Sequence, residues 1–213
     1  RVRPPWLMSP ACPKLLRVLA RAHRLRPADY TEDLPGQAAF LSARQRRVVW
    51  FGANGTGKTN ALVRRLIRVF EGSDPICRLG KSVLSILLVV TSYDAVSARD
   101  LAQQLHALAP DGLLAQVEAG PDGRPVSRAS PWYGPGKGFR GHPPRIVVQH
   151  GPMKGTTLNV ATLGSGPGAS AGGTLDLILV NEPVSRALID ELATRDRADA
   201  LGYLWYAFTP IVG

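Results

Sequence analysis

The chain has little cysteine and no long apolar run. Only Cys12 and Cys77 occur among 213 residues, far apart and without partners at metal-ligand spacing. Neither a disulfide framework nor a cysteine-based metal site is indicated, and we expect a reducing, intracellular setting. No apolar run approaches the roughly 20 residues that a membrane-spanning helix needs, and no signal peptide precedes the first predicted helix. We therefore expect no membrane association.

Acidic residues are scarce beside basic ones. There are 16 Asp and Glu against 26 Lys and Arg, mostly arginine, and the net charge is +10. Such a surface attracts polyanions, of which nucleic acid is the commonest inside cells, although an ordinary solvated basic surface is the alternative. The hydrophobic fraction of 45% is sufficient for a real core, and the length fits one large α/β domain.

The N-terminal residues 1–36 are predicted to form a basic helix and a linker that precede the main domain. A helix beginning at Pro13 carries Lys14, Arg17, Arg21 and Arg24 at spacings of three and four, which gives a basic stripe along one face. Either a solvated face or contact with DNA or an acidic partner accounts for that stripe. We take residues 37–213 as the main domain.

In residues 37–213, apolar strands alternate with helices, which predicts a mostly parallel central sheet covered by helices on both faces. Residues 48–51 are continuously apolar, as is typical of a parallel strand covered on both sides. Residues 145–150 and 156–163, joined by GPMKG, predict a β-hairpin insertion. The other predicted strands are residues 82–90, 175–180 and 203–208, and the predicted helices are residues 58–70, 95–109 and 184–193.

A segment dense in Gly and Pro, residues 119–145, combines basic and aromatic side chains. Trp132, Tyr133 and Phe139 lie among several arginines and a lysine. Rings can stack on bases while guanidinium groups bind phosphate, so this segment is compatible with nucleic-acid contact. A mobile surface loop or a subunit contact explains it equally well.

The strongest motif is GANGTGKT, Gly52 to Thr59, which matches the P-loop pattern completely and lies between a predicted strand and helix. Its glycines permit a tight turn whose N–H groups surround phosphate, and the positive helix N-terminus points at the same anion. Lys58 is expected to reach the β- and γ-phosphates of ATP, and the Thr59 hydroxyl to bind Mg²⁺. The predicted nucleotide-binding residues here are Gly52, Ala53, Asn54, Gly55, Thr56, Gly57, Lys58, Thr59 and Asn60.

Hydrolysis also requires a group that activates water, and LDLILVNEP at residues 175–183 provides a candidate. Here a predicted buried strand ends with Asn181 and Glu182. Ligands gather at the carboxyl ends of parallel strands, where the P-loop also lies. We therefore predict that Glu182 polarises the attacking water, the alternative being a carboxylate that caps the next helix. Asn181 could hold Mg²⁺ through a water but brings no negative charge, which predicts weaker Mg²⁺ affinity.

Taken in order, these motifs resemble the ATPase half of the large terminase subunit of tailed bacteriophages, the motor that drives DNA into an empty capsid. The resemblance runs from about Gln37 to the C-terminus. Its parts are the Q-x-x-F element at Gln37 and Phe40, the P-loop, the SILLVV strand with the helix after it, LDLILVNEP, ALIDELATR and YAFTPIVG. It implies an α/β P-loop ATPase fold of the ASCE type.

The resemblance also implies roles, cofactors and partners. Gln37 would help to hold the adenine, and Thr209 would sense the γ-phosphate from a strand lying between the Walker A and Walker B strands. ATP and Mg²⁺ would be the cofactors. Double-stranded DNA, the portal of the procapsid and the small terminase subunit would be the partners of a homo-oligomeric ring. Such a ring would work in the cytoplasm of the infected bacterial host, at the portal vertex.

Two departures from the family pattern concern charge. Asn181 stands where an Asp often precedes the catalytic Glu. Ala171 and Gly172 stand where many members carry an Arg-Gly pair whose arginine acts as a finger. A finger contributes roughly 10³- to 10⁵-fold in rate where one exists. The candidates for that role here are Arg128, Arg140 and Arg195.

Large terminases continue into a nuclease domain that uses clustered carboxylates, and no such cluster follows in this sequence. We expect this chain to be a piece of a longer protein that does not itself cut DNA. Two other readings remain open: another nucleic-acid ATPase such as a helicase or RecA-like protein, and a nucleotide-binding switch or small-molecule kinase.

Overall fold

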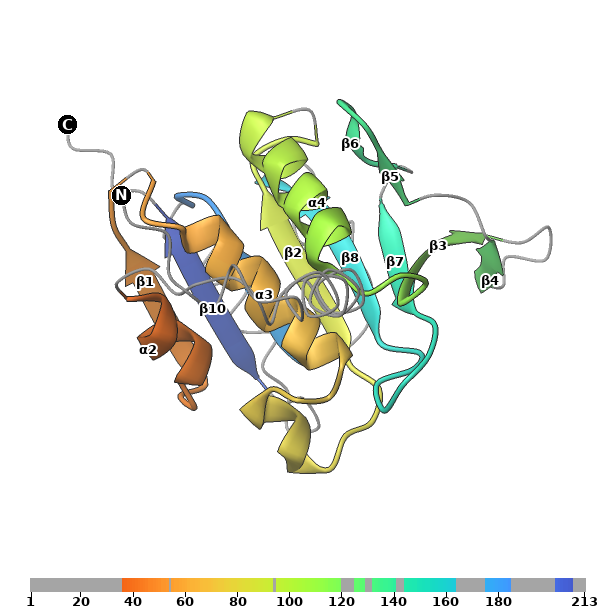
Figure 1. Cartoon of the computed structure of the whole chain (residues 1–213), viewed down its shortest axis with the longest axis horizontal. Helices are drawn as coiled ribbons and strands as arrows, with labels where there is room; N and C mark the ends of the chain where they lie inside the picture. Colours follow the sequence, from red (N-terminus) through yellow and green to blue (C-terminus); the bar gives the residue numbers. More distant parts are fainter. Residues whose placement is uncertain are drawn as a thin grey trace, which may run out of the picture.

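An eight-stranded sheet forms the centre of the molecule, with the strand order β1-β10-β9-β2-β8-β7-β3-β4 (Figure 1). The computed structural model describes residues 36–53, 55–93, 95–119, 125–128, 132–140, 144–163, 175–184 and 202–208. The sheet strands are β1 (Arg47–Phe51), β2 (Ser85–Val90), β3 (Leu114–Ala119), β4 (Pro125–Arg128), β7 (Arg145–Val148), β8 (Thr157–Thr162), β9 (Leu177–Val180) and β10 (Tyr203–Phe208). The helical elements are α2 (Gln37–Ser42), α3 (Lys58–Phe70), the 3-10 turn η3 (Pro75–Leu79) and α4 (Val96–Leu108).

The first five strands in this order are parallel. β10 pairs with β1 on one side and with β9 on the other, and β2 pairs with β9 and β8. All four residues of β9 and the last five of β2 are buried, as expected of strands enclosed on both faces. The predicted α/β P-loop fold with a mostly parallel central sheet is confirmed, and residues 203–208 form β10 between β1 and β9, as predicted. Helix coverage of both faces of the sheet stays a prediction.

The remaining strands are antiparallel and extend the same sheet. β7 pairs with β8, which confirms the predicted hairpin, and β3 and β4 follow beyond it. The expectation that the hairpin is an insertion is wrong, because β8 pairs with β2 over six residues as an integral strand. Leu158 and Val160 of β8 are fully buried in the main core, and this burial ties the hairpin to the central sheet.

β1 differs from its prediction as a doubly covered strand. Among the described strands it pairs only with β10, and its residues alternate between exposed and half-buried. Val49 is 57% exposed and Phe51 is 65% exposed. A continuous apolar run reports the residue types but not the coverage of each face, so the sequence could not distinguish this strand from an interior one.

α3 and α4 lie side by side against one face of the sheet (Figure 1). α3 has the predicted bounds, and α4 buries Ala98, Leu101, Ala102 and Leu105, which fall at the spacing of one helix face. The other face of the sheet has its own apolar cluster, which includes Leu87 and Val180. The predicted helices near residues 13–26 and 184–193 lie outside the described residues, apart from Val184. No helix in the described part is long and apolar enough to cross a membrane.

In the Gly/Pro-rich segment the described residues form a small hairpin of β5 (Tyr133–Gly134) and β6 (Gly138–Phe139) that packs on α4. Trp132 and Phe139 are each only 6% exposed and belong to the main core. The ring of Tyr133 stacks on His106 of α4 at a centroid distance of 4.5 Å. The proposed stacking of these rings on bases is therefore not supported for Trp132 and Phe139, because protein side chains cover them.

A buried arginine, Arg65 of α3, joins α3 to α2. Arg65 Nε lies 3.1 Å from Asp74 Oδ2, and both side chains are fully buried. Arg65 also donates to the carbonyls of Phe40 and Ala43, and its guanidinium lies 3.7 Å from the centroid of the Trp205 ring. Burial lowers the pKa of Arg65 and raises the pKa of Asp74, while the attraction between the two charges acts against both shifts. The pair is thus held by hydrogen bonds as well as by charge.

Candidate nucleotide-binding site

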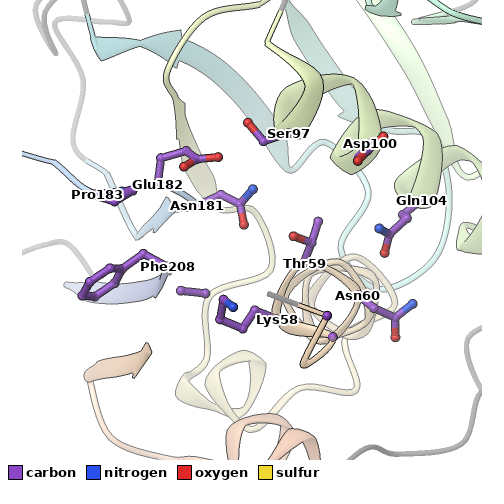
Figure 2. A pocket seen from close by; sticks show the side chains of 13 residues that line it. Lys58, Thr59, Asn60, Ser97, Asp100, Gln104, Asn181, Glu182, Pro183 and Phe208 are labelled. Atoms are coloured by element: carbon purple, nitrogen blue, oxygen red, sulfur yellow. The ribbon is translucent and has the colours of Figure 1, made fainter. Parts of the chain in front are cut away.

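A cleft of about 590 Å³ lies at the carboxyl ends of the parallel strands (Figure 2). It is lined by Gly55, Gly57, Lys58, Thr59, Asn60, Ser97, Asp100, Gln104, Asn181, Glu182, Pro183, Ala207 and Phe208. These residues come from the loop after β1, from α3 and α4, from the chain after β9 and from the end of β10. The fold therefore brings the P-loop and the Asn-Glu pair into one cavity, as the sequence predicts.

The P-loop connects β1 to α3 with a backbone that requires glycine at two points. Gly55 and Gly57 have φ angles of 79° and 75°, in the left-handed region that other residues rarely adopt. The loop is also tied to its neighbours, because the Gly52 N–H donates to the carbonyl of Phe208 at 3.4 Å. That bond connects the start of the loop to the end of β10, the strand that precedes Thr209.

The ammonium group of Lys58 crosses the loop. Its Nζ donates to the carbonyls of Gly52 and Ala53, each at 2.7 Å. Burial lowers the pKa of Lys58, and the nearby Glu182 carboxylate partly offsets that shift. A positive charge thus lies at the mouth of the loop, where the helix N-terminus also favours an anion.

Thr59 and Asn181 face the same part of the cleft (Figure 2). Thr59 is in the first turn of α3, and Asn181 directly follows β9 with 7% of its surface exposed. The Asn181 N–H donates to the carbonyl of Val89 in β2 at 3.4 Å, so the residue is fixed between two strand ends. A hydroxyl and an amide oxygen are acceptable to Mg²⁺, which prefers oxygen ligands and retains several waters.

Glu182 lies next along the chain and lines the cleft with a half-buried side chain. Two residues later, the Val184 N–H donates to the Tyr206 hydroxyl at 2.8 Å. That bond holds the chain after β9 against β10. Glu182 and Lys58 line the same cleft, and the negative charge of Glu182 acts to raise the pKa of Lys58.

Gln37 contacts the P-loop from outside the cleft. Its Nε2 donates to the Gly57 carbonyl at 3.0 Å, and only 1% of the residue is exposed. Phe40, one turn further along α2, packs against Trp50 and Trp205 with ring centroids 5.4 and 6.2 Å away. Gln37 does not line the cleft itself, and its role at the adenine stays a prediction.

Several residues predicted to belong to the site do not line the cleft or lie outside the described residues. Gly52 and Ala53 contribute carbonyls to Lys58, and the Thr56 hydroxyl donates to Ala53 at 2.9 Å. Arg128 belongs to β4, at the opposite edge of the sheet from β1, and the exposed Arg140 follows β6. Arg140 does not line the cleft, and a finger role for either arginine stays a prediction. Residues Asn54, Ala171, Gly172, Arg195 and Thr209 lie outside the described part of the chain.

Sequence reasoning missed the side of the cleft that α4 provides. Ser97, Asp100 and Gln104 line it, at spacings of three and four residues. This spacing places all three on one stripe of the helix, beside the face that buries Leu101 and Leu105. The polar stripe was legible in the sequence, but a polar helix face usually meets solvent, and only the packing of α4 on α3 turns it toward the P-loop.

Comparison with known proteins returned few matches. No protein-family model matches this chain, and no curated protein matches it. The structure is similar to the large terminase ATPase domain of Thermus phage P74-26, with a TM-score of 0.46 and 17% identity over all of this chain and 72% of that one. A mutant of the same domain gives a TM-score of 0.43 and 15% identity over 82% of this chain and 64% of the other. Both are ATPase domains of a large terminase, the family that the spaced sequence motifs resemble.

Proposed function

We propose that this chain hydrolyses ATP and that hydrolysis powers the translocation of double-stranded viral DNA into a procapsid. The observation that carries the proposal is the meeting of three elements at one cleft. These are a complete P-loop after β1, a glutamate after β9, and the end of β10, which lies between β1 and β9 and is hydrogen-bonded to the loop. The order of spaced sequence motifs supports the packaging role in particular.

Binding would depend on the loop side of the cleft. Backbone N–H groups of the loop and the α3 N-terminus would surround the β-phosphate, and Lys58 would move from its carbonyl partners toward the β- and γ-phosphates. Gln37 would stabilise the loop through Gly57 while its helix carries the family's adenine-binding role. The base and the ribose would extend away from Glu182.

Hydrolysis would depend on Glu182. Its carboxylate would accept a proton from the attacking water, in line with the leaving β-phosphate, which is the role of a general base. Thr59 and, through a water, Asn181 would hold Mg²⁺, which supplies charge neutralisation at the phosphates when bound. An arginine from an adjacent subunit would add further stabilisation, with Arg128, Arg140 and Arg195 as candidates.

Coupling to movement would run through β10. Gly52 at the start of the P-loop bonds to Phe208, and Thr209 follows directly. Loss of the γ-phosphate would shift the loop and be felt at the end of β10. The small terminase subunit, the portal of the procapsid and a homo-oligomeric ring are the partners we propose, in the cytoplasm of an infected bacterium.

A helicase or RecA-like ATPase could use the same strand order, whereas a nucleotide switch or kinase would not require DNA. The decisive experiment measures ATP hydrolysis without DNA, with double-stranded DNA and with single-stranded DNA, and then tests strand unwinding. We expect stimulation by duplex DNA without unwinding. Robust unwinding would point to the helicase reading, and activity indifferent to both DNA forms would point to the switch or kinase.

A further inference from the structure

The α4 side of the cleft contains a carboxylate that the proposed hydrolysis does not use. Asp100 lies on α4 between Ser97 and Gln104, and these three side chains line the cleft together with Thr59 and Asn60 of α3 (Figure 2). Glu182 and Asp100 are the two carboxylates among the described lining residues. Since Glu182 is assigned to the attacking water, Asp100 requires its own explanation.

Asn60 of α3 and Gln104 of α4 each contribute a side-chain amide to the lining of the same cleft. Asn60 Oδ1 and Gln104 Oε1 are buried and have no donor among the described residues. An ionised carboxylate only accepts hydrogen bonds. A triphosphate carries no donor and would be repelled by Asp100, so this wall does not suit the phosphates. It suits donors of high polarity, and waters bound to a divalent cation are such donors.

The charge of the cleft leads to the same conclusion. Asn181 is neutral at the position next to Thr59 where a carboxylate would ordinarily favour Mg²⁺. No group of three or more His, Cys, Asp or Glu side chains in the described residues could hold a metal on its own. Mg²⁺ usually binds through one or two carboxylates, retained waters and substrate phosphates, and Thr59, Asn181 and Asp100 fit that donor set.

We propose that Asp100 is the residue that positions hydrated Mg²⁺ in this cleft. Its carboxylate accepts hydrogen bonds from waters on the Mg²⁺ that Thr59 and the nucleotide phosphates bind, and it supplies the negative charge that Asn181 lacks. The inference rests on the proposed nucleotide-binding function. The negative charge next to the cation would then come from α4, and not from the residues that follow β9.

The test measures binding of a fluorescent ATP analogue while free Mg²⁺ is titrated, and in parallel in EDTA. Asp100→Asn should lower the apparent Mg²⁺ affinity about tenfold or more, the range for removing an outer-shell partner of a metal. In EDTA the same variant should bind ATP as well as the wild type or better, because a repelling charge has been removed. Asp111→Asn, at an exposed turn outside the cleft, is the matched control and should change neither value.

Relocating the charge makes the test specific. Asn181→Asp alone should raise Mg²⁺ affinity, and the double variant Asp100→Asn with Asn181→Asp should return it toward the wild-type value. If Asp100→Asn matches the Asp111→Asn control while the wild type binds ATP normally, the inference is overturned and the proposed function stands. If the wild type binds no ATP in either condition, both are overturned.

Discussion

The two sides of the cleft offer opposite chemistry to a ligand. The loop side presents backbone N–H groups and the Lys58 ammonium, which suit phosphate oxygens. The side formed by α4 and the end of β9 presents the oxygens of Asp100, Gln104 and Glu182, which suit water and a hydrated cation. Under the proposed function this difference would orient Mg-ATP, with the triphosphate along the loop and the attacking water opposite.

The two sides are also supported differently. The loop is held by Gln37 at Gly57 and by Phe208 at Gly52, and α2 is in turn fixed to α3 by Arg65. The acceptor side depends on strand ends, with Asn181 bonded to Val89 and Val184 bonded to Tyr206. Removing one side should therefore affect nucleotide binding and removing the other should affect turnover, which the following variants test.

Lys58→Ala removes the positive charge of the loop side and should have the largest effect. Charge-assisted hydrogen bonds contribute about 1.5–3 kcal/mol each, so losing those to two phosphates should weaken ATP binding more than about a hundredfold, in effect abolishing it. Equilibrium binding of a fluorescent ATP analogue measures this. Lys154→Ala, at an exposed turn between β7 and β8, is the control and should bind normally. Tight binding by Lys58→Ala would disprove the assignment of the loop.

Glu182→Gln removes the proposed base while keeping the shape of the side chain. ATP binding should be retained and turnover should fall by roughly 10²- to 10⁴-fold, the usual contribution of a general base. Single-turnover hydrolysis measures the loss, and Glu71→Gln, at the end of α3 outside the cleft, is the matched control. Turnover at the wild-type rate would mean that another group activates the water.

Arg65→Met tests whether the loop side depends on the buried support beneath it. The variant leaves Asp74 as an unpaired buried carboxylate, and breaking such a pair costs about 3–5 kcal/mol of unfolding free energy. Urea unfolding measures the change, and Arg68→Met, on a less buried turn of the same helix, should cost much less. Equal losses in the two variants would contradict a special role for the Arg65–Asp74 pair.

Gln37→Ala should have the smallest effect and separates two roles. If the side chain mainly stabilises the loop through the Gly57 carbonyl, its loss should lower the free energy of unfolding by about 1–3 kcal/mol, the cost of an unsatisfied buried acceptor, and weaken ATP and CTP binding alike. We expect this equal loss, because Gln37 Nε2 donates to the Gly57 carbonyl and the residue does not line the cleft. A loss confined to ATP would instead support recognition of the adenine. The exposed Gln45→Ala is the control.

The sequence predicted the position of the loop between β1 and α3 better than it predicted the surroundings of the loop. The turn in GANGTGKT requires positive φ angles at Gly55 and Gly57, which glycine adopts readily. This local requirement can be recognised from the sequence without a structure. The Asn-Glu pair after a buried strand was also recognisable, since strand ends in parallel sheets form sites. Both predictions depend on residue types within a few positions of one another.

Features that depend on distant contacts were not predictable. The continuous apolar run of β1 predicted an enclosed strand, yet Val49 and Phe51, which share one face of this strand, are exposed. Trp132 and Phe139 looked available for base stacking, yet α4 and the core cover them. In each case the residue type was correctly read, and its neighbours were unknown.

The sequence by itself determined the phosphate loop, the strand–helix alternation and the candidate base Glu182, because each is set by residue types at short spacing. Only the tertiary structure decided what faces the loop. The parallel strand order brings the end of β9 to the P-loop, and the packing of α4 on α3 turns Asp100 into the same cleft. Lys58, Asp100 and Glu182 are far apart in the sequence and meet there through strand pairing and helix packing, and no short-range pattern specifies such a meeting.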